Sequence, residues 1–116
     1  MRLINRIYKE KRKESALLRW WAYLEARKIT RILGKKFGAE RVVLFGSLAK
    51  KDSHFDMASD IDLAAQGLGG HFFQAYGYCA QVGRFNLDLK PYEDMPEYFK
   101  GRIEQEGSVL YEKKRS

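Results

Sequence analysis

Apolar residues recur at helical spacing between Ser15 and Phe37, with good helix-forming residues between them, and they predict a long amphipathic helix. The positions expected to face the core are Leu17, Trp21, Leu24, Ile29, Ile32 and Leu33. Trp20 and Tyr23 widen the apolar stripe beyond what one packing face needs. For these two side chains we favour a contact with a partner protein or a second copy of the chain over a place in the core.

Two strands are predicted after this helix, which we expect to end near Gly38. The run Arg41 to Phe45 is β-branched and aromatic, as is typical of a buried strand. The segment Ser59 to Gln66 alternates polar and apolar residues, and side chains two apart on a strand share a face. Asp60 and Asp62 are therefore expected on one face of the second strand, opposite its apolar residues.

A helix and a third strand are predicted next. Gly67 to Gly70 indicates a turn, and the segment His71 to Phe85 indicates a helix. The side chains expected to face inward in this helix are Phe72, Phe73, Tyr76 and either Cys79 or Ala80. From Phe85 to Asp94 the chain alternates again until Pro91 ends the strand, which places Asp88 on the polar face.

The remaining segments predict a short helix from about Pro96 to a stop at Gly107, followed by a brief apolar stretch from Val109 to Tyr111. The order helix, strand, strand, helix, strand, helix is typical of an α/β or α+β domain built on one sheet with helices packed against it. With 116 residues the chain has room for one core. We therefore expect a single domain over residues 15–116, preceded by a basic extension at residues 1–14.

Charge narrows the choice of partners. The formal net charge of +7 favours a polyanion, which can be nucleotide phosphates, nucleic acid or an acidic protein. Much of the excess lies in the first 14 residues, where basic and apolar positions are interleaved. The basic ones are Arg2, Arg6, Lys9, Lys11, Arg12 and Lys13, and the apolar ones are Leu3, Ile4, Ile7 and Tyr8. This segment is either an amphipathic extension of the first helix, which docks on a partner or on nucleic acid, or a disordered, solvated start.

Other compositional features exclude several classes. The chain has neither a run of about 18 apolar residues nor the apolar segment of a secretory signal, so we expect a cytoplasmic protein without membrane contact. The one cysteine, Cys79, excludes an internal disulfide and a cysteine-based zinc site, and its apolar neighbours predict a packed thiol. His54 and His71 are far apart and give no reason to expect zinc.

The paired aspartates are the first candidate for chemistry. Cα atoms two apart on a strand are roughly 6–7 Å apart, and unpaired carboxylates at that spacing repel each other. Mg²⁺ would relieve this repulsion, because it takes carboxylate and phosphate oxygens as ligands. Asp88, on a different strand, would supply a third ligand. Two ions about 4 Å apart can bind both the attacking and the leaving oxygen of a phosphoryl displacement.

Gly46 and Ser47 would form the complementary half of such a site. Glycine lets the backbone approach a phosphate, the serine hydroxyl and a neighbouring amide donate to its oxygens, and a following helix would direct its N-terminus there. Lys50 and Lys51 lie just beyond. A triphosphate bound between amides and metal ions is set up for nucleotidyl transfer. Taken singly, an Asp-x-Asp also fits the exposed face of an edge strand, and a Gly-Ser pair also fits an ordinary turn.

Taken together, these residues resemble a known family. The Gly46-Ser47 pair after a hydrophobic strand, Ser59 to Leu63 on the next strand and the NLDL sequence around Asp88 are similar to the minimal nucleotidyltransferases of the DNA polymerase beta superfamily. The closing segment, Arg102 to Glu112, is similar as well. The resemblance covers about residues 25–113, and it implies the small mixed sheet packed against helices of that family.

The resemblance also implies roles for these residues. The Gly46-Ser47 pair, with Lys50 beside it, would bind ATP or another nucleoside triphosphate. Asp60 and Asp62 would hold two Mg²⁺ ions, and Asp88 would complete the first metal site and help to activate the acceptor hydroxyl. Such proteins are typically antitoxins encoded beside a HEPN-domain partner. They neutralise this ribonuclease toxin by binding it or by transferring AMP to one of its tyrosines.

The chain departs from the family pattern in the loop that follows the Gly-Ser pair. Twelve residues, Leu48 to Ser59, separate this pair from the first aspartate. That is longer than in the small members of the family, and Lys51 stands where glycine is common. Because the loop carries no expected ligand, we expect altered geometry on the phosphate side rather than loss of metal binding.

Three functions compete on this basis. The first is Mg²⁺-dependent transfer of a nucleoside monophosphate, AMP by preference, to a hydroxyl of a protein partner. The second is a non-catalytic antitoxin that occludes its partner with the surface formed by Trp20, Trp21 and Tyr23. The third is nucleic-acid binding through the basic termini, which ranks last because no RNA- or DNA-binding motif accompanies the charge.

Overall fold

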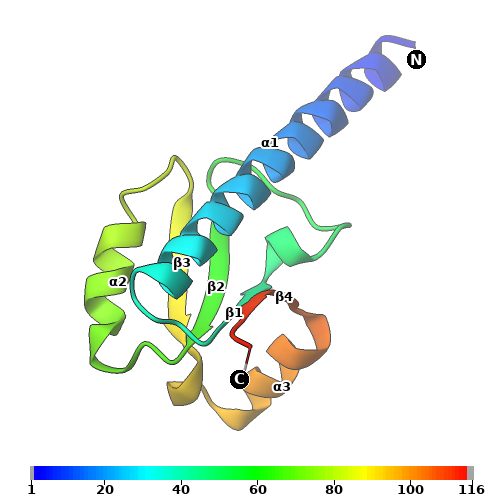
Figure 1. Ribbon diagram of the computed structural model, residues 1–116. Coiled ribbons are helices and arrows are strands. Elements are labelled where there is room, and N and C mark those ends of the chain that lie inside the picture. Colours follow the sequence, from blue (N-terminus) through cyan, green and yellow to red (C-terminus); the bar gives the residue numbers. More distant parts are fainter. Residues whose placement is uncertain (1, 115–116) are drawn as a thin grey trace.

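A computed structural model describes residues 2–114, except for the side chains of Arg2, Tyr8 and Lys11. Within this range four strands form one mixed sheet in the order β3-β2-β1-β4 (Figure 1). The strands are β1 (Arg41–Phe45), β2 (Asp60–Gln66), β3 (Asn86–Pro91) and β4 (Ser108–Glu112). β1 is antiparallel to β2 and β4, whereas β2 and β3 are parallel. The expected α/β domain with a single small mixed sheet is confirmed.

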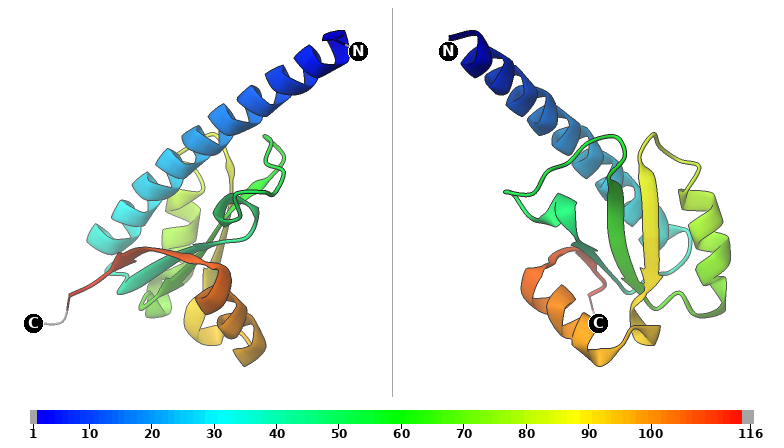
Figure 2. Two further views of the ribbon diagram at one scale, coloured as in Figure 1. Left: turned by 90° about the vertical axis from the view of Figure 1, so that its right-hand side faces the viewer. Right: turned by 180° about the vertical axis from the view of Figure 1, so that it is seen from behind.

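Three α-helices of the described range cover the two faces of this sheet. They are α1 (Arg2–Lys35), α2 (Phe72–Cys79) and α3 (Glu97–Glu106). Leu44 and Leu63 point to one face and join α1 and α2 in the main core. Their neighbours Val43 and Ala64 point to the other face and pack against Ile103 of α3 in a smaller cluster, because successive side chains of a strand alternate. Figure 2 shows α1 and α3 on opposite sides of the sheet.

Of the two alternatives for the N-terminal segment, the helical extension is the one that the structure shows. α1 begins at Arg2 instead of Ser15 and ends at Lys35, so residues 2–14 continue the helix and a disordered start is wrong for this segment. The N-terminal turns project beyond the rest of the molecule (Figure 1). Leu3, Ile4 and Ile7 are exposed there, while the expectations for Arg2, Tyr8 and Lys11 fall on side chains outside the described ones. The expected division of the chain at residue 14 lies within the helix and stays a prediction.

The face of α1 that packs on the sheet agrees with the prediction at Ile29, Ile32 and Leu33 and differs from it further toward the N-terminus. Three expected core residues are exposed instead: Leu17, Trp21 and Leu24. The buried stripe consists of Ala22, Ala26, Ile29, Thr30 and Leu33. Alanines at the crossing let the helix lie close to the sheet, which leaves the larger side chains on its flanks. Tyr23 packs against the core, whereas Trp20 is 56% exposed, so the two aromatic residues have different environments.

α2 is shorter than predicted, but it turns the expected face inward except at Phe73: Phe72 and Tyr76 pack against the core, and Cys79 is buried. It ends at Cys79 rather than near Phe85, and Phe73 is 84% exposed while Ala75 is buried. The prediction that Phe73 faces inward, which followed from the size of its side chain, is therefore wrong. The packed thiol is confirmed, because Cys79 is buried and burial raises its pKa to about 11.

The C-terminal segments complete the sheet and its second face. The expected helix after Pro96 is α3, and the apolar stretch after Gly107 is an edge strand, β4, which the predicted element order lacks. β4 pairs with β1, and the register shifts between Val42 and Val43. No helix in the described range combines the length and the apolar character that crossing a membrane requires.

Candidate active site

Three aspartates meet where the parallel strands β2 and β3 begin. Asp62 and Asp88 are register partners, and Asp60 lies two residues before Asp62 on the same face of β2. One carboxylate oxygen from each residue lies within 4.8 Å of the other two. Ile61 and Leu63 are buried on the opposite face, as the alternation predicts. The fold therefore brings together all three carboxylates that the sequence selected.

The negative charge of this cluster is only partly compensated. Burial raises the pKa of Asp62 to about 7, and the charges of Asp88 and Asp60 add to the rise. Lys90 opposes it: this lysine lies two residues after Asp88 on β3, with Nζ 3.4 Å from Asp88 Oδ1. A half-buried cluster of oxygen donors whose repulsion is only partly relieved suits a hard divalent cation. The residues present therefore fit Mg²⁺.

Gly46 places the end of β1 directly against this cluster. Its φ is +72°, a left-handed conformation that favours glycine, and a Cβ built there would overlap Oδ2 of Asp62. Phe45, the preceding residue, is the register partner of Asp62. The backbone of the Gly46-Ser47 turn consequently lies beside the carboxylates.

The sequence predicts a helix after Gly46, and the structure does not have an α-helix there. Only a 3₁₀ turn follows, Ser47–Ala49. Lys50 comes directly after it, and its side chain is paired with α3, with Nζ 3.4 Å from Oε2 of Glu106. The expected contacts of Ser47 and Lys50 with a nucleotide stay predictions.

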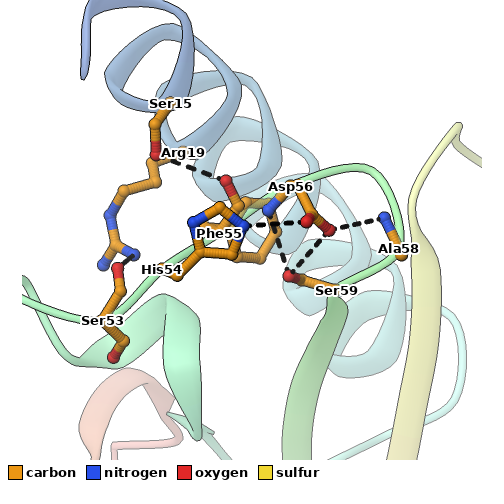
Figure 3. A network of polar contacts seen from close by, with 8 residues as sticks. All are labelled: Ser15, Arg19, Ser53, His54, Phe55, Asp56, Ala58 and Ser59. Atoms are coloured by element: carbon orange, nitrogen blue, oxygen red, sulfur yellow. Dashed lines mark hydrogen bonds and ion pairs between the residues drawn. The ribbon is translucent and has the colours of Figure 1, made fainter. Parts of the chain in front are cut away.

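The long loop between this turn and β2 is fixed at its centre and at its end (Figure 3). Phe55 is fully buried in the main core, and its carbonyl accepts a hydrogen bond of 3.3 Å from the Ser15 hydroxyl. Asp56 closes the turn that leads into β2 by accepting from the backbone N–H of Ala58 at 2.9 Å. The ring of His54 lies 2.8 Å from the same side chain, and this hydrogen bond lowers the pKa of Asp56.

Two residues of α1 that the sequence analysis missed hold the chain around the site. The guanidinium of Arg19 donates to four backbone carbonyls of the loop after Gly46. The carboxylate of Glu25 accepts from the N–H groups of Arg84 and Phe85, at 2.7 and 3.2 Å, just before β3. No motif could have indicated either, because their partners are backbone groups. Lys90, by contrast, could have been found from the sequence, because it lies two residues after Asp88 on the same strand and therefore on the same face.

The sequence and the fold of this chain were compared with known proteins. The family model described as "Polymerase beta, Nucleotidyltransferase" matches residues 27–116. A mutant form of the toxin–antitoxin MntA-HpeT superposes with a TM-score of 0.60 and 17% identity, over 73% of this chain and 70% of that one. A structure of a toxin–antitoxin with AMP-PNP gives a TM-score of 0.61 and 17% identity, over 74% of this chain and 73% of that one. At such low identity these two structures show a shared fold alone.

A search of curated proteins finds no match. The family model nevertheless spans well over half of the chain and includes the Gly46-Ser47 turn and all three aspartates. The resemblance noted in the sequence is thereby confirmed: the chain belongs to the polymerase beta nucleotidyltransferase family.

Proposed function

We propose that the protein is an Mg²⁺-dependent nucleotidyltransferase that transfers a nucleoside monophosphate, AMP from ATP, to a hydroxyl group of a protein partner. The observation that carries the proposal is the cluster of Asp60, Asp62 and Asp88 with the backbone of Gly46 against it. Membership of the nucleotidyltransferase family supports the reaction class. A structural neighbour solved with AMP-PNP supports an adenine nucleotide as the donor.

Each residue of the site has a distinct task in this proposal. The three aspartates would hold Mg²⁺, which when bound neutralises phosphate charge and stabilises the charge that develops in the transition state. The Gly46-Ser47 turn would orient the triphosphate with its N–H groups and the serine hydroxyl, and Lys50 would add positive charge beside it. The acceptor oxygen bonds to the α-phosphorus while the bond to pyrophosphate breaks. The carboxylate of Asp88 accepts the proton of the acceptor hydroxyl.

The proposed partner is a toxin. Both structural neighbours are toxin–antitoxin proteins. We therefore propose that this chain acts as the antitoxin of a HEPN-domain ribonuclease and that the acceptor is a tyrosine of that toxin. Transfer of AMP would add a phosphate charge and bulk to the tyrosine, which blocks a site that must bind RNA.

Titration calorimetry with ATP, with and without Mg²⁺, tests the nucleotide site. We expect Mg²⁺-dependent binding by the natural protein and no binding by the double variant Asp60→Asn, Asp62→Asn. Asp94→Asn is the matched control, because it removes one exposed carboxylate outside the cluster. If the double variant bound ATP as tightly as the natural protein, the proposed site would be contradicted. If it also transferred AMP to the partner at the same rate as the natural protein, the metal mechanism would be excluded.

A second candidate function is neutralisation by occlusion, and the exposed apolar side of α1 favours it. Trp20 and Trp21 are 56% and 55% exposed. Next to Trp21, a groove of about 610 Å³ runs between α1 and the loops before β2 and β3. Its lining residues include Leu18, Trp21, Leu24, Met57, Val82 and Phe85. Large exposed aromatic side chains beside such a groove are typical of a protein interface.

The two functions make opposite predictions for Asp60→Asn, and Trp20→Ala tests the surface that occlusion requires. If occlusion is sufficient, Asp60→Asn still neutralises the toxin and Trp20→Ala does not. If AMP transfer is required, Asp60→Asn fails even though it binds the toxin. Tyr98→Ala is the matched control, since Tyr98 is an exposed aromatic residue on α3. Toxin binding and ribonuclease activity, measured side by side, separate the two functions.

A further inference from the structure

Arg19 of α1 binds the loop that begins at the Gly46-Ser47 turn. Its Nη1 donates to the carbonyl oxygens of Ser47 and Ser53, at 3.2 and 3.0 Å. Its Nη2 donates to those of Leu48 and Lys50, at 3.1 and 2.7 Å. The guanidinium thus connects the first residues of the loop to a residue six positions further along, which closes the loop around one cation. Figure 3 shows its contact with Ser53.

Arginine suits this position for a physical reason. Carbonyl oxygens that converge on one point repel each other unless a cation with several donors lies among them. A guanidinium is planar, always charged and has five N–H donors, so each terminal nitrogen can serve two carbonyls. A lysine has three donors on one atom and cannot span the same set. Ser53 also donates its hydroxyl to the Lys50 carbonyl at 3.2 Å, which tightens the same loop.

The orientation of the turn links Arg19 to the candidate active site. In a 3₁₀ turn the carbonyls and the leading N–H groups point in opposite directions along the axis, and the leading N–H groups have no partner inside the turn. Arg19 binds the carbonyls of Ser47 and Leu48. The leading N–H groups are thereby held facing away from Arg19. Gly46, at this end of the turn, lies against the carboxylate of Asp62.

We propose that Arg19 is a positioning residue for nucleotide binding: by holding the carbonyls of the loop after Gly46, it fixes the N–H groups of the Gly46-Ser47 turn where the triphosphate binds. This inference rests on the proposed nucleotidyltransferase function. It also explains how a loop longer than is usual in the family, with Lys51 at a position where glycine is common, keeps a defined shape. The restraint comes from α1 and not from the loop sequence.

The test compares three variants in the full chain. Arg19→Gln removes the charge and most donors, and Arg19→Lys keeps the charge without the planar donor set. Arg27→Gln is the matched control, because Arg27 is an exposed arginine of the same helix, about two turns further along. Three quantities are measured: hydrogen exchange in residues 46–56, affinity for Mn²⁺ alone, and affinity for a non-hydrolysable ATP analogue with Mg²⁺.

For Arg19→Gln we expect faster exchange in the loop, an unchanged Mn²⁺ affinity and an analogue Kd raised by about tenfold or more, because misplacement by about 1 Å already weakens a positioned contact strongly. Arg19→Lys should restore part of the analogue affinity, and Arg27→Gln should behave as the natural protein. A purely structural role would instead lower Mn²⁺ affinity and analogue affinity together.

Three outcomes would overturn the proposal. One is unchanged exchange in the loop of Arg19→Gln. Another is a looser loop with unchanged analogue affinity. The third is the joint loss of Mn²⁺ and analogue affinity that a purely structural role would cause. Failure of the proposed function is recognised separately, since the natural protein would then bind Mn²⁺ or nothing, and no analogue. In that case the proposed role of Arg19 in nucleotide binding is refuted together with the proposed function. The hydrogen-exchange data still decide whether Arg19 holds the loop.

Discussion

Replacing Asp62 by asparagine should stabilise the metal-free protein while it removes metal binding. The pKa of Asp62 rises from 3.8 to about 7, first because the carboxyl is partly buried and then because of Asp88 and Asp60. A carboxyl with a raised pKa in the folded state favours folding only while it is protonated. Its ionisation therefore lowers the free energy of unfolding progressively between about pH 4 and pH 7. Asparagine has nearly the same shape and no charge, so it avoids this loss.

The size of the effect follows from the two pKa values. The difference between 3.8 and about 7 corresponds to about 4 kcal/mol, at about 1.4 kcal/mol for each pH unit. Solvent screens a carboxyl that is only half-buried and the cluster can relax, so we expect Asp62→Asn to raise the free energy of unfolding by about 1–3 kcal/mol at pH 8 in EDTA. Near pH 4 the two proteins should be almost equally stable. Excess Mg²⁺ should stabilise the natural protein and leave the variant unchanged.

Urea unfolding followed by tryptophan fluorescence, at pH 4 and pH 8 with EDTA or Mg²⁺, measures these differences. Asp52→Asn serves as the control, since it removes one exposed carboxylate outside the cluster. A stability difference between Asp62→Asn and the natural protein that is the same at both pH values would refute the electrostatic reasoning. A variant less stable than the natural protein in EDTA at pH 8 would refute it as well.

Two further perturbations test the geometry around the cluster. Gly46→Ala should lower the free energy of unfolding by at least about 1 kcal/mol and weaken Mn²⁺ binding, because alanine is strained at a φ of +72° and its Cβ would overlap the carboxylate of Asp62. Gly77→Ala, whose added Cβ meets no atom within 4 Å in α2, should instead stabilise by about 0.5–1 kcal/mol in the same urea assay. Phe55→Ala should lower the free energy of unfolding by about 3–5 kcal/mol, because Phe55 is fully buried. A loss below about 1 kcal/mol in urea unfolding would show that the loop core is not packed as described.

The parts of this fold that were predictable depend on local rules, and the rest depends on pairing. Period-two alternation placed Asp60 and Asp62 on one face, because side chains of a strand alternate whatever surrounds them. The meeting of Asp62 with Asp88 depends on the parallel register of two strands, which no local pattern encodes. Asp88 was expected as the third ligand from its place on the polar face of another strand, and the resemblance to a family supported that expectation without giving the register.

The errors have a common physical cause. The buried stripe of α1 was predicted from the size of Trp21 and Leu24, but the sheet selects the small residues Ala22 and Ala26 where the helix crosses closely. Phe73 was misplaced for the same reason. Arg19 was missed because its partners are backbone carbonyls, which are present at every residue and leave no trace in the sequence.

The position of β4 at the edge of the sheet has a consequence for synthesis on the ribosome. All the candidate site residues lie on or next to β1, β2 and β3, so they emerge before residue 92. β4, which pairs with the other side of β1, emerges after them. Until then the backbone of β1 has one unpaired side, which is a template for pairing with other chains. Until β4 pairs with β1, the nascent protein therefore exposes an open strand edge next to the segment that carries the Gly46-Ser47 turn.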